Sequence, residues 1–299
     1  MEHLLSVVMR AARVHEYGGP DVIRLEDLPR PVPGPGEVLI HVAATSLNPT
    51  ETALRSGRLA AFLPVTLPLT LGWDVAGTVD GEPVIGMLDE GAAAEFAVGP
   101  ATALVPAPAS VPLADAAALP LAGMTAWQAV TEHARIAPGE RVLINGAGGG
   151  IGGFAVQLAK HAGAYVLATA SPRSAATVRA LGADEVLDYT AGPPTVGAPV
   201  DAVVNCAAIS AAAAAALVPL VRPGGRLVTV ATPIEASPEV NAWHMVTRND
   251  PADLKALVHL LDTGVLRLVI TARRSLADLP ELHRLAENGG THGKIIVSL

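Results

Sequence analysis

The eight residues from Asn145 to Gly152, NGAGGGIG, are the part of this chain whose types and spacing point most directly to chemistry. Small residues let the backbone approach a pyrophosphate, and a helix that begins there offers free N–H groups and the positive end of its dipole. The segment lies between an apolar run at 141–145 and a helical pattern at 151–162, which is the context that a dinucleotide fingerprint requires. The sequence therefore predicts a dinucleotide-binding turn.

The fingerprint fits this turn in two registers. In the first register the three small positions are Ala147, Gly149 and Gly152, and in the second each position lies one residue later. A tight strand-to-helix turn with no ligand is a third interpretation. The predicted cofactor contacts in the turn are Ala147, Gly148, Gly149, Gly150, Ile151 and Gly152.

The end of the next predicted strand selects between the two nicotinamide dinucleotides. An acidic residue about 20 positions beyond the turn binds the ribose 2′-hydroxyl of NAD. Here the segment 169–173 reads TASPR and contains no acid. Ser171 and Arg173 supply the donors and the cation that a 2′-phosphate requires, so they predict NADPH. An arginine that only meets solvent at a helix start is the other interpretation of Arg173.

The elements around the turn alternate between strand and helix from about residue 119 onward. The pattern predicts strands at 141–145, 164–170, 185–188, 201–205 and 226–230, and helices at 151–162, 174–181 and 253–263. The turn Pro223–Gly225 is expected to introduce the last of these strands. This order predicts a doubly wound, parallel Rossmann-type sheet.

The two ends of the chain have a different character. The first 115 or so residues contain short β segments broken by proline, including 37–44 and 74–79. The last 35 residues are mixed and end in a predicted strand at 294–297. We therefore expect the chain to leave the nucleotide-binding domain and to rejoin the first domain.

Composition excludes several classes of protein. The chain has 299 residues, of which 51% are hydrophobic and 16% charged, so it is not a disordered chain. A net charge of −8 does not fit a nucleic-acid-binding protein. The only cysteine, Cys206, excludes an intramolecular disulfide and any multi-cysteine metal site. A reducing, cytoplasmic location is expected.

Membrane insertion is not expected either. The uncharged stretch 202–221 is rich in alanine and is interpreted as a buried strand followed by a buried helix. The first ten residues lack the features of a secretory signal. Residues 1–8 are assigned no function.

Several further motifs occur in a familiar order along residues 9–299. With them, the chain resembles the zinc-independent quinone oxidoreductases, the zeta-crystallin-like group of the medium-chain dehydrogenase/reductase superfamily. The motifs are NPTET at 48–52, RSG at 55–57, GWDVAG at 72–77, LPLAGMTAW at 119–127, LGAD at 181–184 with Tyr189, and GK at 293–294.

The resemblance implies an α/β protein with two domains. A mostly β, GroES-like catalytic domain would comprise residues 1–118 and 265–299, and a Rossmann domain would comprise residues 119–264. The resemblance also implies bound NADPH and commonly a homodimer. It places Asn48 and Thr125 near the nicotinamide, as catalytic and cofactor-binding residues. The alternative interpretation, without the resemblance, is that Asn48 only begins a turn and that Thr125 only begins a helix.

The remaining cofactor contacts are likewise implied by the resemblance. Some would surround the adenosine 2′-phosphate, and others would line the far side of the nicotinamide. The first set is Ser171, Arg173 and Tyr189, and the second is Ala231, Thr232 and Pro233, with Lys294 as a further contact.

Two departures from related patterns concern the metal and the substrate pocket. Zinc-dependent relatives carry cysteine near the position of Asn48 and Gly-His-Glu at 72–74, where this chain has Gly-Trp-Asp. A tetrahedral zinc would lack ligands here, so no metal is predicted. Ala53 stands where the family often has tyrosine. A wider pocket for bulky acceptors is therefore expected, with Phe62, Leu63 and Trp243 as candidate lining.

The expected activity is transfer of hydride from NADPH to a small-molecule quinone or α,β-unsaturated carbonyl (enone), without a metal ion. Two alternatives stay open. One is an enoyl-thioester reductase, which uses the same fold and hydride donor. The other is a catalytically idle NADPH-binding protein. Neither a nucleic acid nor a membrane is expected as a partner.

Overall fold

The computed structural model describes residues 8–235 and 237–299, so what was expected of residues 1–7 lies outside the described part. The chain divides into two units. Of the described residues, unit 1 comprises 8–121, 249–258 and 270–299, and unit 2 comprises 122–235, 237–248 and 259–269. The domain limits expected from the sequence were 118/119 and 264/265. In the structure, residues 249–258 belong to unit 1, although they were expected in the Rossmann domain; they include the first part of a helix.

Two sheets form unit 1. Its larger sheet has seven strands in the order β15-β16-β3-β5-β6-β8, with β7 also paired to β3, and its smaller sheet has the order β2-β1-β4. The strands are β1 (Val8–Val14), β2 (Ile23–Pro29), β3 (Glu37–Ser46), β4 (Leu69–Thr70), β5 (Asp74–Val79), β6 (Glu82–Met87), β7 (Phe96–Pro100), β8 (Leu104–Pro106), β15 (Ile270–Ser275) and β16 (Lys294–Ser298). Because β16 pairs with β3, residues from both ends of the chain form one sheet.

Three helices of unit 1 pack beside these sheets. They are α1 (Pro49–Arg55), α2 (Leu113–Ala116) and α8 (Leu279–Glu287). Leu54 on α1 and Leu279 on α8 join Val14, Leu69 and Val297 in one buried core. Burial of these apolar side chains holds the short α1 in place, because a helix of this length is not stable alone.

Unit 2 contains a parallel sheet of six strands in the order β11-β10-β9-β12-β13-β14. This is the strand order of a doubly wound Rossmann fold, which confirms the predicted fold class of this region. The strands are β9 (Arg141–Asn145), β10 (Tyr165–Ala170), β11 (Glu185–Asp188), β12 (Val200–Asn205), β13 (Val221–Thr229) and β14 (Asn241–His244). Their continuous apolar runs reflect burial on both faces of a parallel sheet.

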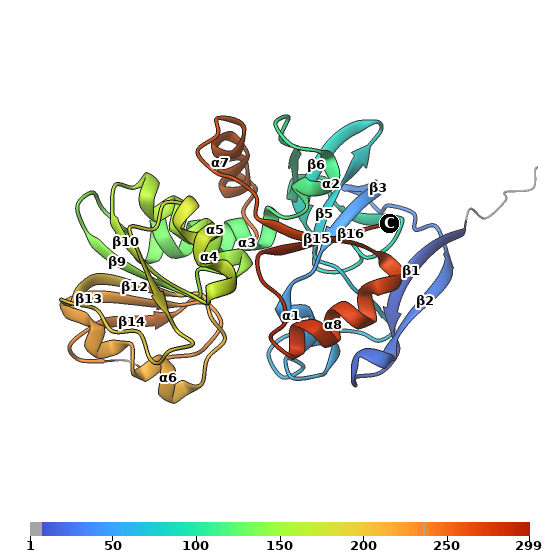
Figure 1. Cartoon of the computed structure of the whole chain (residues 1–299). Helices are drawn as coiled ribbons and strands as arrows, with labels where there is room; N and C mark the ends of the chain where they lie inside the picture. Colours follow the sequence, from blue (N-terminus) through green and yellow to red (C-terminus); the bar gives the residue numbers. More distant parts are fainter. Residues whose placement is uncertain (1–7, 236) are drawn as a thin grey trace, which may run out of the picture. The chain divides into compact units, whose positions relative to one another are not determined.

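Two helices that begin and end near their predicted residues cover one face of this sheet. Helix α4 (Gly150–His161) packs on β9 and β10, and α5 (Pro172–Ala180) packs on β10 and β11. Figure 1 shows both on the same face of the sheet. The other helices are α3 (Pro120–Trp127), α6 (Ala211–Ala215) and α7 (Pro251–Asp262), and a π-helical segment at Gln128–His133 continues α3.

Two expectations for the region 200–230 were wrong. Pro223–Gly225 does not introduce β13 but lies inside it: Val221 already pairs with Val200, and the register shifts before Ala202 pairs with Arg226. The extra residues are accommodated as an irregularity in which Gly224 has a φ of +72°. Helix α6 was expected to be buried, yet only its Ala214 is. Short alanine side chains bury little area, so little free energy drives this helix into a core.

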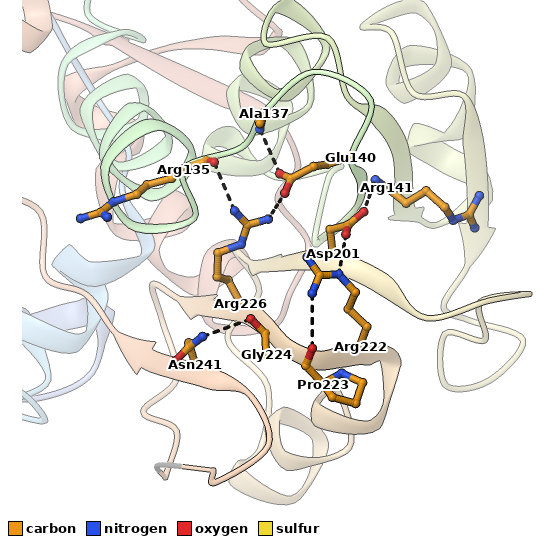
Figure 2. Close-up of polar contacts among 10 residues, drawn as sticks. All are labelled: Arg135, Ala137, Glu140, Arg141, Asp201, Arg222, Pro223, Gly224, Arg226 and Asn241. Atoms are coloured by element: carbon orange, nitrogen blue, oxygen red, sulfur yellow. Dashed lines mark hydrogen bonds and ion pairs between the residues drawn. The ribbon is translucent and has the colours of Figure 1, made fainter.

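The amino-terminal ends of the parallel strands are tied together by ion pairs (Figure 2). Asp201 on β12 accepts from Arg222 Nε at 2.6 Å and from the backbone N–H of Arg141 at 2.9 Å. Arg226 on β13 pairs with Glu140, which also accepts from the N–H of Ala137. These contacts stabilise the sheet edge opposite the glycine-rich turn. Among the described residues, no helix is long and apolar enough to cross a membrane.

Candidate functional site

The glycine-rich turn joins the carboxyl end of β9 to the amino end of α4. Gly146 has a φ of +85°, and a Cβ at Gly152 would lie 2.2 Å from the carbonyl oxygen of Gly146. Only glycine fits there, because real Cβ atoms do not approach oxygen so closely. A Cβ at Gly153 would instead meet its nearest atom at an ordinary 3.5 Å. The packing therefore favours the register that ends at Gly152.

This turn fits the pyrophosphate of a dinucleotide. Gly149 is the N-cap of α4, and the N–H groups of the first helical turn, Gly150 to Gly152, have no partner within a helix. Ala147 is buried, whereas Gly148, Gly149, Gly150 and Ile151 are at least partly exposed. Backbone donors and the positive end of a helix dipole are what an anionic group requires.

The residues expected around a 2′-phosphate lie at the same edge of the sheet. Ser171 directly follows β10 as the N-cap of α5, and Tyr189 directly follows β11. Ala170 pairs with Asp188, so Ser171 and Tyr189 continue two adjacent strands. Arg173 is exposed in the first turn of α5, and Tyr189 is 52% exposed. The structure thus brings these predicted residues to one edge.

The other predicted residues of unit 2 are also placed. Ala231, Thr232 and Pro233 follow β13, and the Thr232 hydroxyl donates to Ile209 O at 2.9 Å. Thr125 lies within α3 rather than at its start, with its hydroxyl oxygen 2.6 Å from that of Thr247. Thr125 is buried, so helix initiation does not account for it.

Unit 1 holds a buried polar cluster of five side chains, which we call the Asn48 cluster: Ser46, Asn48, Glu51, Asp74 and Lys294. The Asn48 amide nitrogen donates to Asp74 Oδ2 at 2.9 Å and to Glu51 Oε1 at 3.1 Å. Its amide oxygen accepts from Lys294 Nζ at 2.7 Å. Asp74 also accepts from the Ser46 hydroxyl and lies 3.4 Å from Lys294 Nζ. The amide of Asn48 therefore links the cluster together.

Three strands and a helix position this cluster. Ser46 ends β3, Asp74 begins β5 and Lys294 begins β16, while Glu51 lies on α1 just after Asn48. Strand β3 is the neighbour of both β5 and β16, so the ends of three adjacent strands meet here. Asn48 and Lys294 were predicted from the sequence as site residues, whereas Ser46, Glu51 and Asp74 were not. The motifs at 48–52 and 72–77 contained Glu51 and Asp74, and no local pattern paired them.

The electrostatics of the cluster follow from its burial. Desolvation raises the pKa of Glu51 from 4.5 to about 8; the bond from Asn48 opposes this rise, and the charge of Asp74 adds to it. At neutral pH Glu51 therefore carries its proton. With Glu51 neutral, the charges that the cluster contains are those of the Asp74–Lys294 ion pair at 3.4 Å, which balance each other.

The cluster does not fit a zinc ion. It contains neither a thiolate nor an imidazole, and the Lys294 ammonium lies 2.7 Å from the Asn48 amide oxygen. In the part of the chain that the structure describes, no group of three or more His, Cys, Asp or Glu side chains could hold a metal ion. Cys206 follows β12, half-buried, and burial raises the pKa of its thiol to about 12. Metal independence of the activity stays a prediction.

The residues expected to line a wide acceptor pocket are divided between the two units. Ala53 is half-buried on α1. Phe62 is 86% exposed and Leu63 is 44% exposed in the segment that follows α1. Trp243 lies on β14 in unit 2, where its indole N–H donates to His133 Nδ1 at 2.9 Å. The acceptor preference expected from Ala53 stays a prediction.

A second buried ionisable group lies elsewhere in unit 1. His283 on α8 is fully buried, and neither of its ring nitrogens has a hydrogen-bond partner. Desolvation, with a smaller effect of the Arg55 charge, lowers its pKa from 6.5 to about 3. Arg55 is itself fully buried and pairs with Glu287. The ring of His283 is therefore neutral in the folded protein.

Glu51 and His283 predict a plateau in stability between about pH 4.5 and 6.5. Glu51 keeps its proton in the folded chain up to about pH 8, so stability falls as the pH rises from 4.5 to 8. His283 takes up a proton only near pH 3 when folded, so stability falls as the pH drops from 6.5 to 3. In the shared window the two slopes, each at most about 1.4 kcal/mol per pH unit, cancel.

Urea unfolding from pH 3 to 9 measures this profile. The Glu51→Gln variant should lose the decline above pH 6.5, because its amide stays neutral. The His283→Leu variant should lose most of the decline below pH 4.5, because leucine has no ring nitrogen to take up a proton. The ring makes no hydrogen bonds in the folded chain, so the substitution breaks none. A wild-type profile that rises steadily from pH 6.5 to 8 would contradict the placement of Glu51.

Comparison with known proteins places these features in a family. Residues 34–109 match the alcohol dehydrogenase GroES-like domain family, and residues 181–297 match the zinc-binding dehydrogenase family. The chain is 33% identical to the chloroplastic quinone-oxidoreductase QR1 of Triphysaria versicolor, over 97% of this chain and 98% of that protein. It is 34% identical to the chloroplast envelope quinone oxidoreductase homolog of Arabidopsis thaliana, with the same coverage of both chains.

Solved structures agree with these relatives. The quinone oxidoreductase from Coxiella burnetii superposes with a TM-score of 0.89 at 28% identity, covering 98% of this chain and 99% of that one. A mycobacterial protein complexed with NADPH reaches 0.85 at 27% identity, over 97% and 100% of the two chains. The CurK enoyl reductase reaches 0.83 at 26% identity, over 97% and 99%. The predicted combination of a GroES-like and a Rossmann-type domain is confirmed, and the chain belongs to the quinone oxidoreductase group of the medium-chain dehydrogenase/reductase superfamily.

Proposed function

We propose that the protein uses NADPH to reduce a quinone or an α,β-unsaturated carbonyl compound, without a metal ion. That the protein is an oxidoreductase that depends on NAD(P)H follows from the family. The observation that carries the proposal is the turn closed by Gly152, followed along the sheet edge by Ser171 and Arg173 instead of an acid. A structural neighbour complexed with NADPH supports the choice of cofactor.

The chain's own residues have separate tasks in this proposal. When bound, the dinucleotide supplies a hydride. The N–H groups at the start of α4 hold its pyrophosphate, and Ser171, Arg173 and Tyr189 hold its 2′-phosphate. Asn48 and Thr125 are proposed to lie near the nicotinamide and to orient the reacting groups there. Lys294 fixes the amide of Asn48 by donating to its oxygen.

An assay of NADPH oxidation tests the activity. We expect turnover with quinones or enones, and we expect it to persist with a chelator present throughout, because the proposal needs no metal ion. Activity that disappears on chelation and returns with zinc would refute metal independence. NADPH binding without turnover of any acceptor would identify an idle binding protein.

A second candidate is reduction of an enoyl thioester. It is favoured by the similarity to the CurK enoyl reductase over nearly the whole chain. Crotonyl-CoA in the same assay separates the two: a kcat/KM for crotonyl-CoA well above that for every quinone and simple enone would select the thioester activity.

Arg173 provides a direct test of cofactor preference. Arg173→Gln removes a cation while keeping the helix, so the Kd for NADPH should rise about 10- to 100-fold, the range expected for a lost charge-assisted hydrogen bond. The Kd for NADH should change little. Arg179→Gln, an exposed arginine on the same helix, is the matched control. Unmodified protein that binds NADH as tightly as NADPH would contradict this reading of the site.

A homodimer in the cytoplasm is the proposed assembly and location. The family resemblance supports the first, and the use of a single cysteine is compatible with the second. Curated relatives include chloroplastic and mitochondrial proteins, so relatives alone do not select a compartment. Light scattering of the purified chain measures the oligomeric state.

A further inference from the structure

Three buried polar side chains lie on neighbouring strands next to the glycine-rich turn. They are Asn145 on β9, Thr169 on β10 and Asn205 on β12. The N–H of Gly146 donates to the Thr169 hydroxyl at 2.8 Å, and this hydroxyl donates to Asn145 Oδ1 at 2.7 Å. Asn145 Nδ2 then donates to Asn205 Oδ1 at 2.8 Å. One chain of hydrogen bonds thus crosses three strands.

The same chain continues into the loop that follows β12. Asn205 binds Ala207 through both ends of its amide: its Nδ2 donates to Ala207 O at 3.2 Å, and its Oδ1 accepts from Ala207 N at 3.2 Å. Two residues later, Ile209 N donates to the Thr232 hydroxyl at 3.0 Å, which donates back to Ile209 O at 2.9 Å. The loop is therefore held by Asn205 at one point and by Thr232 at the next.

This loop also packs directly on the turn. A Cβ at Gly146 would lie 2.9 Å from both the N and the Cβ of Ala207, so the absence of a side chain at Gly146 allows this close contact. The N–H groups of Gly146 and Ala147 both point at Thr169, the first at its hydroxyl and the second at its carbonyl oxygen at 3.1 Å. The N–H of Gly149 donates to Gly146 O at 3.1 Å, so the N–H groups left for an anion are those of Gly150 to Gly152 at the start of α4.

Buried polar groups stabilise one arrangement strongly when all of them are paired, because any other arrangement leaves some of them unpaired. Here the pairing joins the turn at Gly146 to the loop that Thr232 holds. We propose that Asn145, Thr169 and Asn205 are positioning residues for the dinucleotide. They fix the spacing between the turn proposed to hold the pyrophosphate and the segment after β13 proposed to line the nicotinamide. This inference rests on the proposed binding of NADPH.

The first experiment compares two variants at one position. Thr169→Val has the same shape as threonine but loses both hydrogen bonds, whereas Thr169→Ser keeps the hydroxyl. The Kd for NADPH, measured by titration without any acceptor, should rise at least about tenfold in Thr169→Val and stay within about threefold in Thr169→Ser. Equal Kd values in wild type and Thr169→Val would overturn the proposal.

Gln157→Met is the matched control for lost buried hydrogen bonds. Gln157 is a buried amide on α4 that bonds to Gly153 O and to the backbone of Arg267, away from the network. We expect this variant to melt at a lower temperature with an unchanged Kd for NADPH. If Gln157→Met and Thr169→Val raise the Kd equally for the same loss of stability, the network acts only through folding and the proposal is wrong.

A double-mutant cycle tests the coupling along the chain. Thr232→Val breaks the far end of the network, so Thr169→Val should cost less affinity in its presence. The double variant should raise the Kd by no more than about one third of the product of the two single increases. If the Kd of the double variant instead rises by the product of the two single increases, the two residues act independently and the proposed coupling is wrong. Wild-type protein that binds no NADPH would instead refute the proposed function itself, which separates the two failures.

Discussion

Gly152→Ala is expected to raise the Kd for NADPH about 10- to 100-fold, whereas Gly153→Ala, one residue further on, should leave it within about twofold. The added methyl at 152 would lie 2.2 Å from Gly146 O and 2.7 Å from Ala147 Cα, so the backbone of the turn must move. The methyl at 153 meets a leucine side chain at 3.5 Å and needs no movement. Both changes replace glycine by alanine in one helix, so they share the same gain in helix propensity.

Titration of each variant with NADPH, alongside a thermal melt, measures both effects. Gly153→Ala should melt at or above the wild-type temperature, because its backbone is unstrained. If only Gly153→Ala lost affinity, the fingerprint would lie in the register one residue later. An equal fall in both variants would contradict the special role of Gly152.

Lys294→Met is expected to lower the free energy of unfolding by about 3–5 kcal/mol, which is the usual cost of leaving one charge of a buried pair without its partner. Lys294 is 4% exposed, and its ammonium is the cation of the Asn48 cluster: it lies 3.4 Å from Asp74 Oδ2 and donates to Asn48 Oδ1. Methionine keeps an unbranched side chain that is one atom shorter, and it removes the terminal ammonium with its charge and donors. Asp74 and the amide oxygen of Asn48 would then both lose a partner.

A second substitution shows whether charge is the cause. Adding Asp74→Asn to Lys294→Met removes the orphaned carboxylate, so the double variant should be more stable than Lys294→Met alone. Urea unfolding at pH 6, where Glu51 carries its proton, measures this difference. Lys160→Met is the control, since Lys160 pairs with Asp184 at 2.7 Å but is 42% exposed, and its loss should cost at most about 1 kcal/mol. A Lys294→Met variant no less stable than this control would contradict a buried ion pair.

Local patterns in the sequence determined the Rossmann-type unit. Strand β9 and strand β11 begin and end where the sequence predicted, and helices α4, α5 and α7 lie within two residues of their predicted bounds. A buried parallel strand needs a run of apolar residues, and a tight turn onto a helix needs glycine. Both requirements act over a few neighbouring residues. The family motifs then predicted the fold of the whole chain, and the comparisons confirmed this two-domain fold.

Tertiary structure alone decided which polar residues share a site. Lys294 and Asn48 are 246 positions apart in the sequence, and Asp74 joins them only because β3 lies between β5 and β16. The neutral state of Glu51 likewise depends on burial, which no residue pattern at 48–52 specifies. In unit 2, the network from Gly146 to Thr232 links four segments of the chain, at 145–146, 169, 205–209 and 232, which the order of the strands brings together. The residue type determines which hydrogen bonds a side chain can make, whereas strand order and burial determine which of them form and which protonation state the group has.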